Sequence, residues 1–289
     1  MLFCFRAESR TQGSRPALKS SAASRLFEEN APLKPLSVPI TLTLVLAVAT
    51  CFYAGGWFRL RRTFPDAASF GRCAAFVSGV ITIWVGSPLA VLDHELLSFH
   101  MIQHILLMAV APPLLLMGAP VLVFAHGLPD WFLQRAGPFL RWAPARSTGR
   151  ILTHPVFCWL AATGTVIGWH VPFMFELGQH SQLWHEVQRT SFFITGLFFW
   201  CPVIQPWPTV SRWPAWSVPL YLFLATLPCD ALSAFLAFCD RVVYRPYALQ
   251  DQEWAGVLMW VCITFIYMVP AAVLAVRALS PDASQMEAV

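Results

Sequence analysis

Seven apolar runs of roughly 20 residues constrain the fold of this 289-residue chain more than any other feature. Runs of that length with few charges are long enough to cross the hydrocarbon core of a bilayer. The chain is 57% hydrophobic and only 12% charged, which is too apolar for a soluble domain. We therefore predict an all-α polytopic membrane protein with seven transmembrane helices, at about 36–58, 73–92, 99–125, 155–175, 188–204, 216–238 and 254–276.

The third predicted helix, at 99–125, is the longest interior run, about 40 Å at 1.5 Å per residue. It contains Pro112, Pro113, Gly118 and Pro120. Proline removes a backbone donor and clashes with the preceding turn, so we expect this helix to be kinked.

Three regions follow from this pattern. Residues 1–35 are polar, rich in arginine and serine and without a signal-type apolar core, so we interpret them as a disordered basic extension. Residues 36–276 form the seven-helix transmembrane domain, and residues 277–289 are a short C-terminal tail. The sequence contains no repeat of fixed period and no sign of a second domain.

The arginines of the short loops predict the orientation in the membrane. Loops 59–72 and 126–153 each carry four arginines, whereas loops 93–98 and 176–187 carry no lysine or arginine. Positively charged loops stay in the cytoplasm, which puts the N-terminus outside and the C-terminus inside. The basic N-terminal extension argues the other way, and we give more weight to the two loops because they agree.

Histidines gather on the side that this orientation makes extracytoplasmic. Six of the eight histidines fall there, namely His94, His100, His104, His170, His180 and His185, and only His126 and His154 fall inside. The uneven distribution is the main positional indication of function.

The stretch from 98 to 113 opens the third predicted helix and carries the strongest chemical pattern. His100, His104 and Met108 are spaced i, i+4 and i+8, so a helix presents them on one face. Two imidazoles one turn apart can bind one metal ion, and a thioether suits Cu(I). Met101 lies about 100° away, so a regular helix favours Met108. The alternative is a polar cap at the membrane surface, with histidines bonded to carbonyls or headgroups.

Two further polar residues lie within predicted spans. Asp230 lies in the outer half of the sixth span, where a carboxylate is either functional, protonated or paired with a neighbouring donor. Cys229 beside it is more often a small buried hydrophobe than a ligand. His170 ends the fourth span and is either a ligand or an interfacial histidine beside an aromatic belt.

His185 and Glu186 lie at the outer mouth of the fifth span. A zinc protease of the His-Glu-x-x-His type needs a second histidine where this chain has Arg189, so that activity is excluded. The sequence also has no glycine-rich phosphate loop, no serine nucleophile elbow and no Cys-x-x-Cys pair. We expect no enzymatic activity, and we expect no nucleic-acid partner because the net charge of +4 reflects topology-setting arginines.

Several motifs resemble the CtaG family. His-Met-Ile-Gln-His-Ile-Leu-Leu-Met at 100–108, continuing to Gly-Ala-Pro at 118–120, resembles its signature. Further similarity follows in order along the chain: Gly-Trp-His-Val-Pro at 168–172, the run 185–200, Tyr-Arg-Pro-Tyr at 244–247 and the run 251–260. The resemblance covers roughly residues 70–276.

The resemblance implies a seven-span inner-membrane assembly factor for cytochrome c oxidase of the caa3 type, with oxidase subunits as partners and copper supply as its step. The matched positions are His100, Met101, Gln103, His104, His170 and His185. One departure is Arg189, where family members often have a further histidine. If that histidine is a ligand in the family, the site here is incomplete or built differently.

Together these observations predict that the protein helps copper insertion at the outer face of the membrane. Three alternatives remain open at this point: a haem-binding electron carrier with paired axial histidines, a metal transporter that uses Asp230, and a metal-free scaffold for oxidase subunits. Neutral imidazoles are needed as ligands, so copper binding should weaken as the pH falls below about 6.

The predicted orientation can be tested with single introduced cysteines. A cysteine at Ser147 should resist an impermeant thiol reagent in intact cells, because loop 126–153 is cytoplasmic. A cysteine at Ser181 should react, because loop 176–187 is extracytoplasmic. The opposite labelling pattern would reverse the orientation and remove the argument for an outer site.

Overall fold

The computed structural model describes residues 40–87, 96–128, 135, 149, 151–204, 214 and 216–279. The predicted extension at 1–35 lies outside the described residues, as do His94 and residues 280–289 of the predicted tail. Every regular element in the described part is a helix, so the all-α prediction is confirmed there.

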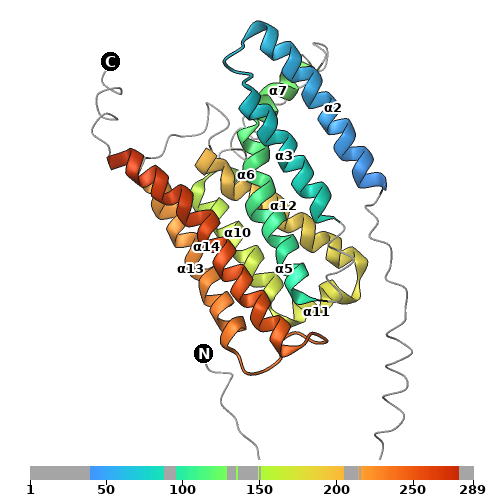
Figure 1. Cartoon of the computed structure of the whole chain (residues 1–289), viewed down its shortest axis with the longest axis vertical. Coiled ribbons are helices and arrows are strands. Elements are labelled where there is room, and N and C mark those ends of the chain that lie inside the picture. The colour runs from blue at the N-terminus through green and yellow to red at the C-terminus, as the bar shows by residue number, and fades with distance from the viewer. Residues whose placement is uncertain are drawn as a thin grey trace, which may run out of the picture. The chain divides into compact units, whose positions relative to one another are not determined.

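The helices follow one another along the chain as Figure 1 shows. The first four are α2 (Ile40–Thr63), α3 (Phe70–Gly86), α5 (Leu97–Ile105) and a π-helical turn, η1 (Leu106–Val110). The remaining seven are α6 (Ala111–Met117), α7 (Pro120–Gly127), α10 (Pro155–His170), α11 (Pro172–His180), α12 (Gln182–Ile204), α13 (Ser217–Phe238) and α14 (Leu249–Leu279).

Five of the described helices are long and apolar enough to cross a membrane: α2, the continuous helix Leu97–Met117, α12, α13 and α14. The pair α10 and α11, bent by 76° at its junction, qualifies as a sixth if it is counted as one span. Helix α3 is apolar but has only 17 residues. The chain is therefore a polytopic helical membrane protein, and the count of seven spans stays a prediction.

The third span has a different form from the one predicted. Its irregularity is the π-helical turn η1, in which the Ala111 amide donates to the Leu106 carbonyl five residues earlier. The physical reason lies in the two prolines that follow, because a proline ring at position i clashes with the carbonyl at i−4. For Pro112 that carbonyl belongs to Met108, inside the widened turn. The span ends at Met117 instead of continuing to 125.

The break after this span is local and sharp. Ala119 has a φ of 46°, the left-handed conformation, and Pro120 then begins α7 as a separate helix. Because L-residues other than glycine rarely adopt this conformation, the break reflects the surrounding packing. The predicted kink of the helix axis at these prolines stays a prediction.

Close contact with α12 accommodates the π-helical turn. A Cβ atom at Gly196 would lie 2.6 Å from the Met108 carbonyl oxygen and 2.9 Å from Cγ of Pro112. Only glycine allows the two backbones to approach this closely. Gly196 thus holds α12 against the part of the third span that carries Met108.

Arginines of the predicted loop 59–72 gather at one end of the helix bundle. At one end the last turn of α2, the first turn of α3 and the end of α7 come together, and Arg59 donates to the Gly127 carbonyl at 3.3 Å. Arg72 donates to the Ala67 carbonyl at 2.6 Å at the same end. The start of α5, helix α11 and the loop between α13 and α14 lie at the opposite end (Figure 1). The predicted arginine-rich loop 59–72 and the histidine-bearing segments are therefore at opposite ends.

The contact at Gly196 gives a stability prediction. Gly196→Ala should lower the melting temperature of the detergent-solubilised protein, since overpacking costs about 1–3 kcal/mol. Gly164→Ala on α10 is the matched control, because a Cβ there would meet nothing within 4 Å. The control should match or slightly exceed the wild-type melting temperature, as alanine favours helix. Equal melting temperatures for both variants and the wild type, measured by tryptophan fluorescence, would contradict the packing argument.

Candidate functional site

His100 and His104 form a buried pair on α5, with 1% and 6% of their surfaces exposed. Their Nε2 atoms lie 2.7 Å apart and their ring centroids 4.2 Å apart. The predicted placement on one helix face is therefore confirmed in the geometry. At 2.7 Å one Nε2 donates a proton to the other, so the two imidazoles share a hydrogen bond across one helical turn.

Aromatic rings and a third histidine surround this pair. The His185 ring of α12 lies 6.0 Å from the His100 ring, centroid to centroid. Phe192 packs against His104 at 4.2 Å, and Phe175 of α11 packs against His100 at 5.3 Å. The bend between α10 and α11 brings Phe175 over the pair. The imidazoles are thus enclosed by apolar walls and shielded from solvent.

His170 contributes a buried nitrogen with a free lone pair. Its Nδ1 is 2.7 Å from the Val166 carbonyl oxygen, and a carbonyl can only accept, so Nδ1 carries the proton. Nε2 is then unprotonated, is buried, and has no hydrogen-bond partner among the described residues. Histidines that bind metals are typically held in this way, with the other ring nitrogen donating to a backbone carbonyl.

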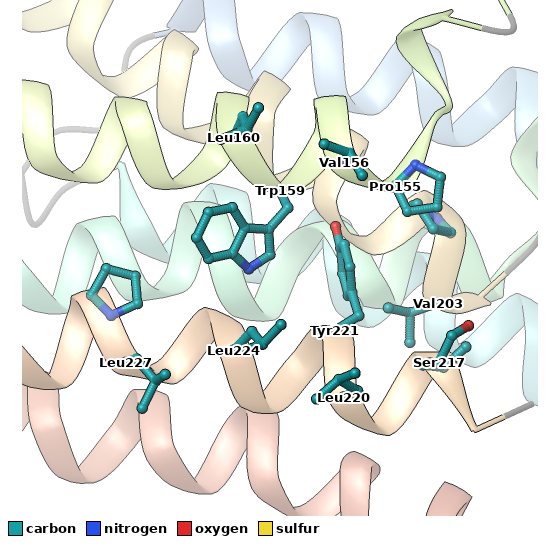
Figure 2. Close-up of a pocket in the computed structure, with 13 residues that line it drawn as sticks. Pro155, Val156, Trp159, Leu160, Val203, Ser217, Leu220, Tyr221, Leu224 and Leu227 are labelled. Carbon is teal, nitrogen blue, oxygen red and sulfur yellow. The ribbon is translucent and has the colours of Figure 1, made fainter.

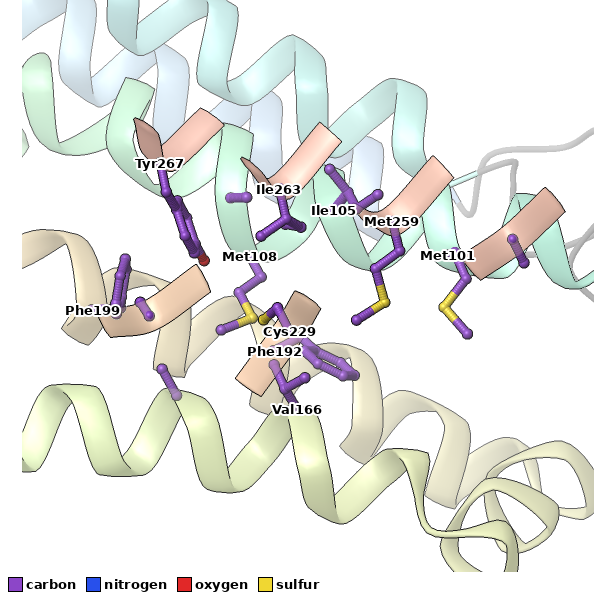
Figure 3. Packing of buried hydrophobic residues seen from close by; sticks show 14 of the residues in the cluster. Met101, Ile105, Met108, Val166, Phe192, Phe199, Cys229, Met259, Ile263 and Tyr267 are labelled. Carbon is purple, nitrogen blue, oxygen red and sulfur yellow. The ribbon is translucent and has the colours of Figure 1, made fainter. Parts of the chain in front are cut away.

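A small cavity of about 30 Å³ adjoins these histidines, with room for about one or two water molecules. Six of its lining residues carry nitrogen or sulfur donors: Met101, His104, Met108, His170, Cys229 and Met259. Figure 3 shows Met101, Met108, Met259 and Cys229 in the same cluster of buried side chains. Both Met101 and Met108, the two predicted sulfur candidates, line the cavity, although a regular helix favours Met108. The long, flexible methionine side chain covers the 100° between them.

The remaining predicted site residues point elsewhere. The side-chain amide of Gln103 donates to the Gly86 carbonyl of α3 at 2.9 Å. Asp230 accepts from the Thr264 hydroxyl at 3.1 Å, so the neighbouring donor considered from the sequence is present. Glu186 is 56% exposed at its side chain and pairs with Arg189 at 3.2 Å. None of these three predicted residues lines the cavity.

The histidines do not form a preassembled site. In the described part of the chain, no three His, Cys, Asp or Glu side chains are placed so that they could together hold a metal ion. Any ion bound here therefore needs a methionine sulfur, or a shift of an imidazole from the position described.

The sequence reasoning missed two residues at the start of α14 that position the site. The Asp251 carboxylate accepts from the backbone amides of Leu97 and Ser98 and from the Ser98 hydroxyl. Gln252 is fully buried, accepts from the Val243 amide at 2.7 Å and donates to the Arg241 carbonyl at 3.1 Å. Both residues belong to the 251–260 motif, which was the available signal.

A tyrosine of another motif ties the neighbouring loop to α10. The Tyr244 hydroxyl donates to the His170 carbonyl at 2.7 Å. Burial raises the pKa of this phenol, so it stays a donor throughout the physiological range. The loop between α13 and α14 is therefore anchored directly beside the buried imidazole of His170.

A larger cavity lies between α10, α12 and α13, with a volume of about 500 Å³ (Figure 2). Its lining is almost entirely apolar, and the Tyr221 hydroxyl donates to the Phe199 carbonyl at 2.9 Å. It contains no histidine, cysteine or carboxylate. This lining is suited to an apolar group such as a hydrocarbon chain. It lacks the nitrogen and sulfur donors of the histidine-lined cavity.

The fold and the site together define a class: a polytopic helical membrane protein with imidazole and sulfur donors buried between its helices. Comparison with known proteins identifies the family within this class. The family model for the cytochrome c oxidase caa3 assembly factor matches residues 51–280, so the chain belongs to this family, Caa3_CtaG. The resemblance stated from the motifs is confirmed.

The curated relatives are mycobacterial. An uncharacterized protein of Mycobacterium leprae is 26% identical over 226 residues, which is 72% of this chain and 34% of that protein. Uncharacterized proteins of Mycobacterium bovis and Mycobacterium tuberculosis are each 28% identical over 234 residues, 75% of this chain and 35% of theirs. The chain thus spans about a third of the length of these relatives. No solved structure matches it.

The Asp251 contacts give a prediction about the position of α5. Asp251→Ala should lower the melting temperature of the purified protein, because loss of charge-assisted bonds to buried amides costs about 1–3 kcal/mol. Asp240→Ala, at an exposed residue of the adjoining loop, is the matched control and should melt like the wild type. A wild-type melting temperature for Asp251→Ala would show that the carboxylate does not hold α5 in place.

Proposed function

We propose that this protein helps insert copper into cytochrome c oxidase at the outer face of the bacterial plasma membrane. Its partners are then oxidase subunits within the bilayer, and its role is non-catalytic. The observation that carries the proposal is the buried His100–His104 pair, with Nε2 atoms 2.7 Å apart, close to the free lone pair of His170.

The pair suits a metal ion because its two ring nitrogens already converge. With a shift of an imidazole from the position described, His100 and His104 would hold a copper ion through their ring nitrogens, because neutral imidazole is a good ligand for copper in either oxidation state. Polar groups buried within a membrane span are costly, which favours a functional reason for their presence. His185, with its ring 6.0 Å from that of His100, is the further candidate at this end of the cluster.

The outer location rests on the arginines of the predicted loop 59–72, which lie at the end of the bundle opposite the start of α5. We infer that the arginine-rich end faces the cytoplasm, in accordance with the positive-inside rule. The histidine-bearing end then faces outward, the N-terminus lies outside and the C-terminus inside. This orientation requires seven spans, with α3 and the bent pair α10 and α11 each crossing once in addition to the five long helices.

Arg189 in place of a family histidine is compatible with this proposal. Its guanidinium pairs with Glu186. We infer that the copper site of this chain uses no ligand at position 189.

The haem alternative is disfavoured by size, since a cavity of about 30 Å³ beside His104 and His170 holds only about one or two waters.

The transporter alternative is disfavoured because Asp230, its proposed path residue, is bonded to Thr264 and does not line this cavity. The metal-free scaffold remains the competing function, and the following experiment separates it from copper delivery.

The test replaces both imidazoles of the pair, as His100→Ala/His104→Ala. Purified under anaerobic reducing conditions, the variant should lose the copper that the wild type retains, and cells that carry it should lack assembled oxidase, partly restored by excess copper. The matched control is His126→Ala, which removes an exposed imidazole of α7 bonded to the Leu122 carbonyl. It should leave copper and oxidase unchanged.

Two results would support the scaffold function instead. One is a wild-type protein that carries no copper, as measured by elemental analysis of the purified sample. The other is normal oxidase assembly in cells with the double histidine variant at wild-type protein level.

A further inference from the structure

The cavity beside the histidine pair is lined by His104 of that pair and by nitrogen and sulfur donors of other segments. Cys229 of α13 and Met259 of α14, neither of which was among the ligands predicted from the sequence, line it together with Met101, Met108, His104 and His170. Resting on the proposed copper function, we propose that this cavity is a Cu(I)-selective chamber in which Cys229, Met108 and Met259 provide the sulfur ligands and His170 the nitrogen ligand.

The first argument is the convergence of the sulfur atoms. Met108, Cys229 and Met259 belong to η1, α13 and α14, three separate segments of the chain, yet their side chains extend toward one space (Figure 3). All three are buried, with 5–7% of their surfaces exposed. Thiolate and thioether ligands select Cu(I) over Cu(II), which prefers nitrogen and oxygen. The donor set of the chamber therefore discriminates between the two oxidation states.

The second argument comes from the buried nitrogens that line the same cavity. Nε2 of His170 carries a lone pair because Nδ1 donates to the Val166 carbonyl, and Nε2 has no hydrogen-bond partner in the described part of the chain. A buried acceptor without a partner costs free energy comparable to a lost hydrogen bond. A ligand in the chamber removes that cost, whereas purely apolar packing does not.

His104 links the chamber to the histidine pair. Its Nε2 is bonded to His100, while its Nδ1 is buried and has no hydrogen-bond partner among the described residues. The residue also lines the cavity, so one imidazole belongs both to the pair and to the chamber. This arrangement gives copper two neighbouring positions, one between His100 and His104 and one among the sulfur atoms.

Charge favours Cys229 as the central ligand. A cation transferred into an apolar interior loses its hydration, which is costly unless an opposite charge accompanies it. Coordination by Cu(I) would release the Cys229 thiol proton to bulk water, so the ion and the thiolate together would carry no net charge. A divalent Cu(II) ion would leave one uncompensated positive charge in the same place. Charge and ligand softness thus favour the same oxidation state.

The test compares copper affinities of the full-length protein in detergent. Cys229→Ala/Met259→Leu removes two sulfurs and keeps most of the packed volume, since leucine and methionine are similar in size. Cu(I) affinity is measured anaerobically by competition with the chromophoric chelator bicinchoninate, and Cu(II) affinity by titration without reductant. We expect the variant to bind Cu(I) about tenfold or more weakly than the wild type, with Cu(II) binding unchanged.

The matched control is Cys158→Ala/Met117→Leu. Cys158 is buried on α10 and donates to the Leu152 carbonyl, Met117 is exposed at the end of α6, and neither lines the chamber. This control should bind Cu(I) like the wild type. Because a core variant can fail to fold, copper X-ray absorption of the Cu(I)-loaded wild-type protein gives an independent result, and we expect sulfur in its ligand shell.

The outcomes separate this proposal from the proposed function. If Cys229→Ala/Met259→Leu retains wild-type Cu(I) affinity, or if the absorption spectrum shows nitrogen and oxygen ligands only, the sulfur chamber is core packing and is overturned. Copper delivery by His100 and His104 would still stand in that case. If the wild type binds copper in neither oxidation state, both proposals are overturned together.

Discussion

The position of the site depends on one carboxylate, Asp251, which joins the start of α14 to the start of α5. The first amides of a helix have no partner within that helix, and here the amides of Leu97 and Ser98 find theirs in this side chain. A negative charge at a helix N-terminus also interacts favourably with the helix dipole. Since His100 follows Ser98 by two residues, the same contact determines where the histidine pair stands relative to α14 and Met259.

The second constraint is the pair of prolines that follows Met108. Their rings prevent a regular α-helix over the preceding turn, and the chain forms a π-helical turn there instead. That wider turn fits only because α12 has no side chain at Gly196, where its backbone meets Met108 and Pro112. π-Helical turns are frequent at functional sites, and here the turn carries a sulfur that lines the cavity.

Because the helices lie in apolar surroundings, it matters which buried polar groups have a hydrogen-bond partner and which do not. In a bilayer, polar groups must find their partners inside the protein. Gln252 and Tyr244 do so, bonding to backbone groups of the loop and of α10. Other buried polar atoms in the described part of the chain have no hydrogen-bond partner, and two of them, nitrogens of His104 and His170, belong to residues that line the same cavity. Their position beside three methionines and a cysteine gives the site its chemical character.

The sequence alone determined the properties that depend on local spacing. Apolar runs predicted a helical membrane protein, the i, i+4 spacing put His100 and His104 on one face, and the motifs identified the family. Only the tertiary structure decided which distant residues meet the pair. Cys229 and Met259 look like ordinary core residues in sequence, because periodicity shows which face of a helix is apolar but not which helix it contacts. The same limit explains Met101: helix geometry gave its angle correctly, but the cavity lies between several helices and receives side chains from a wide arc of α5. Packing between helices, which depends on contacts such as Gly196 and Asp251, determines that arrangement.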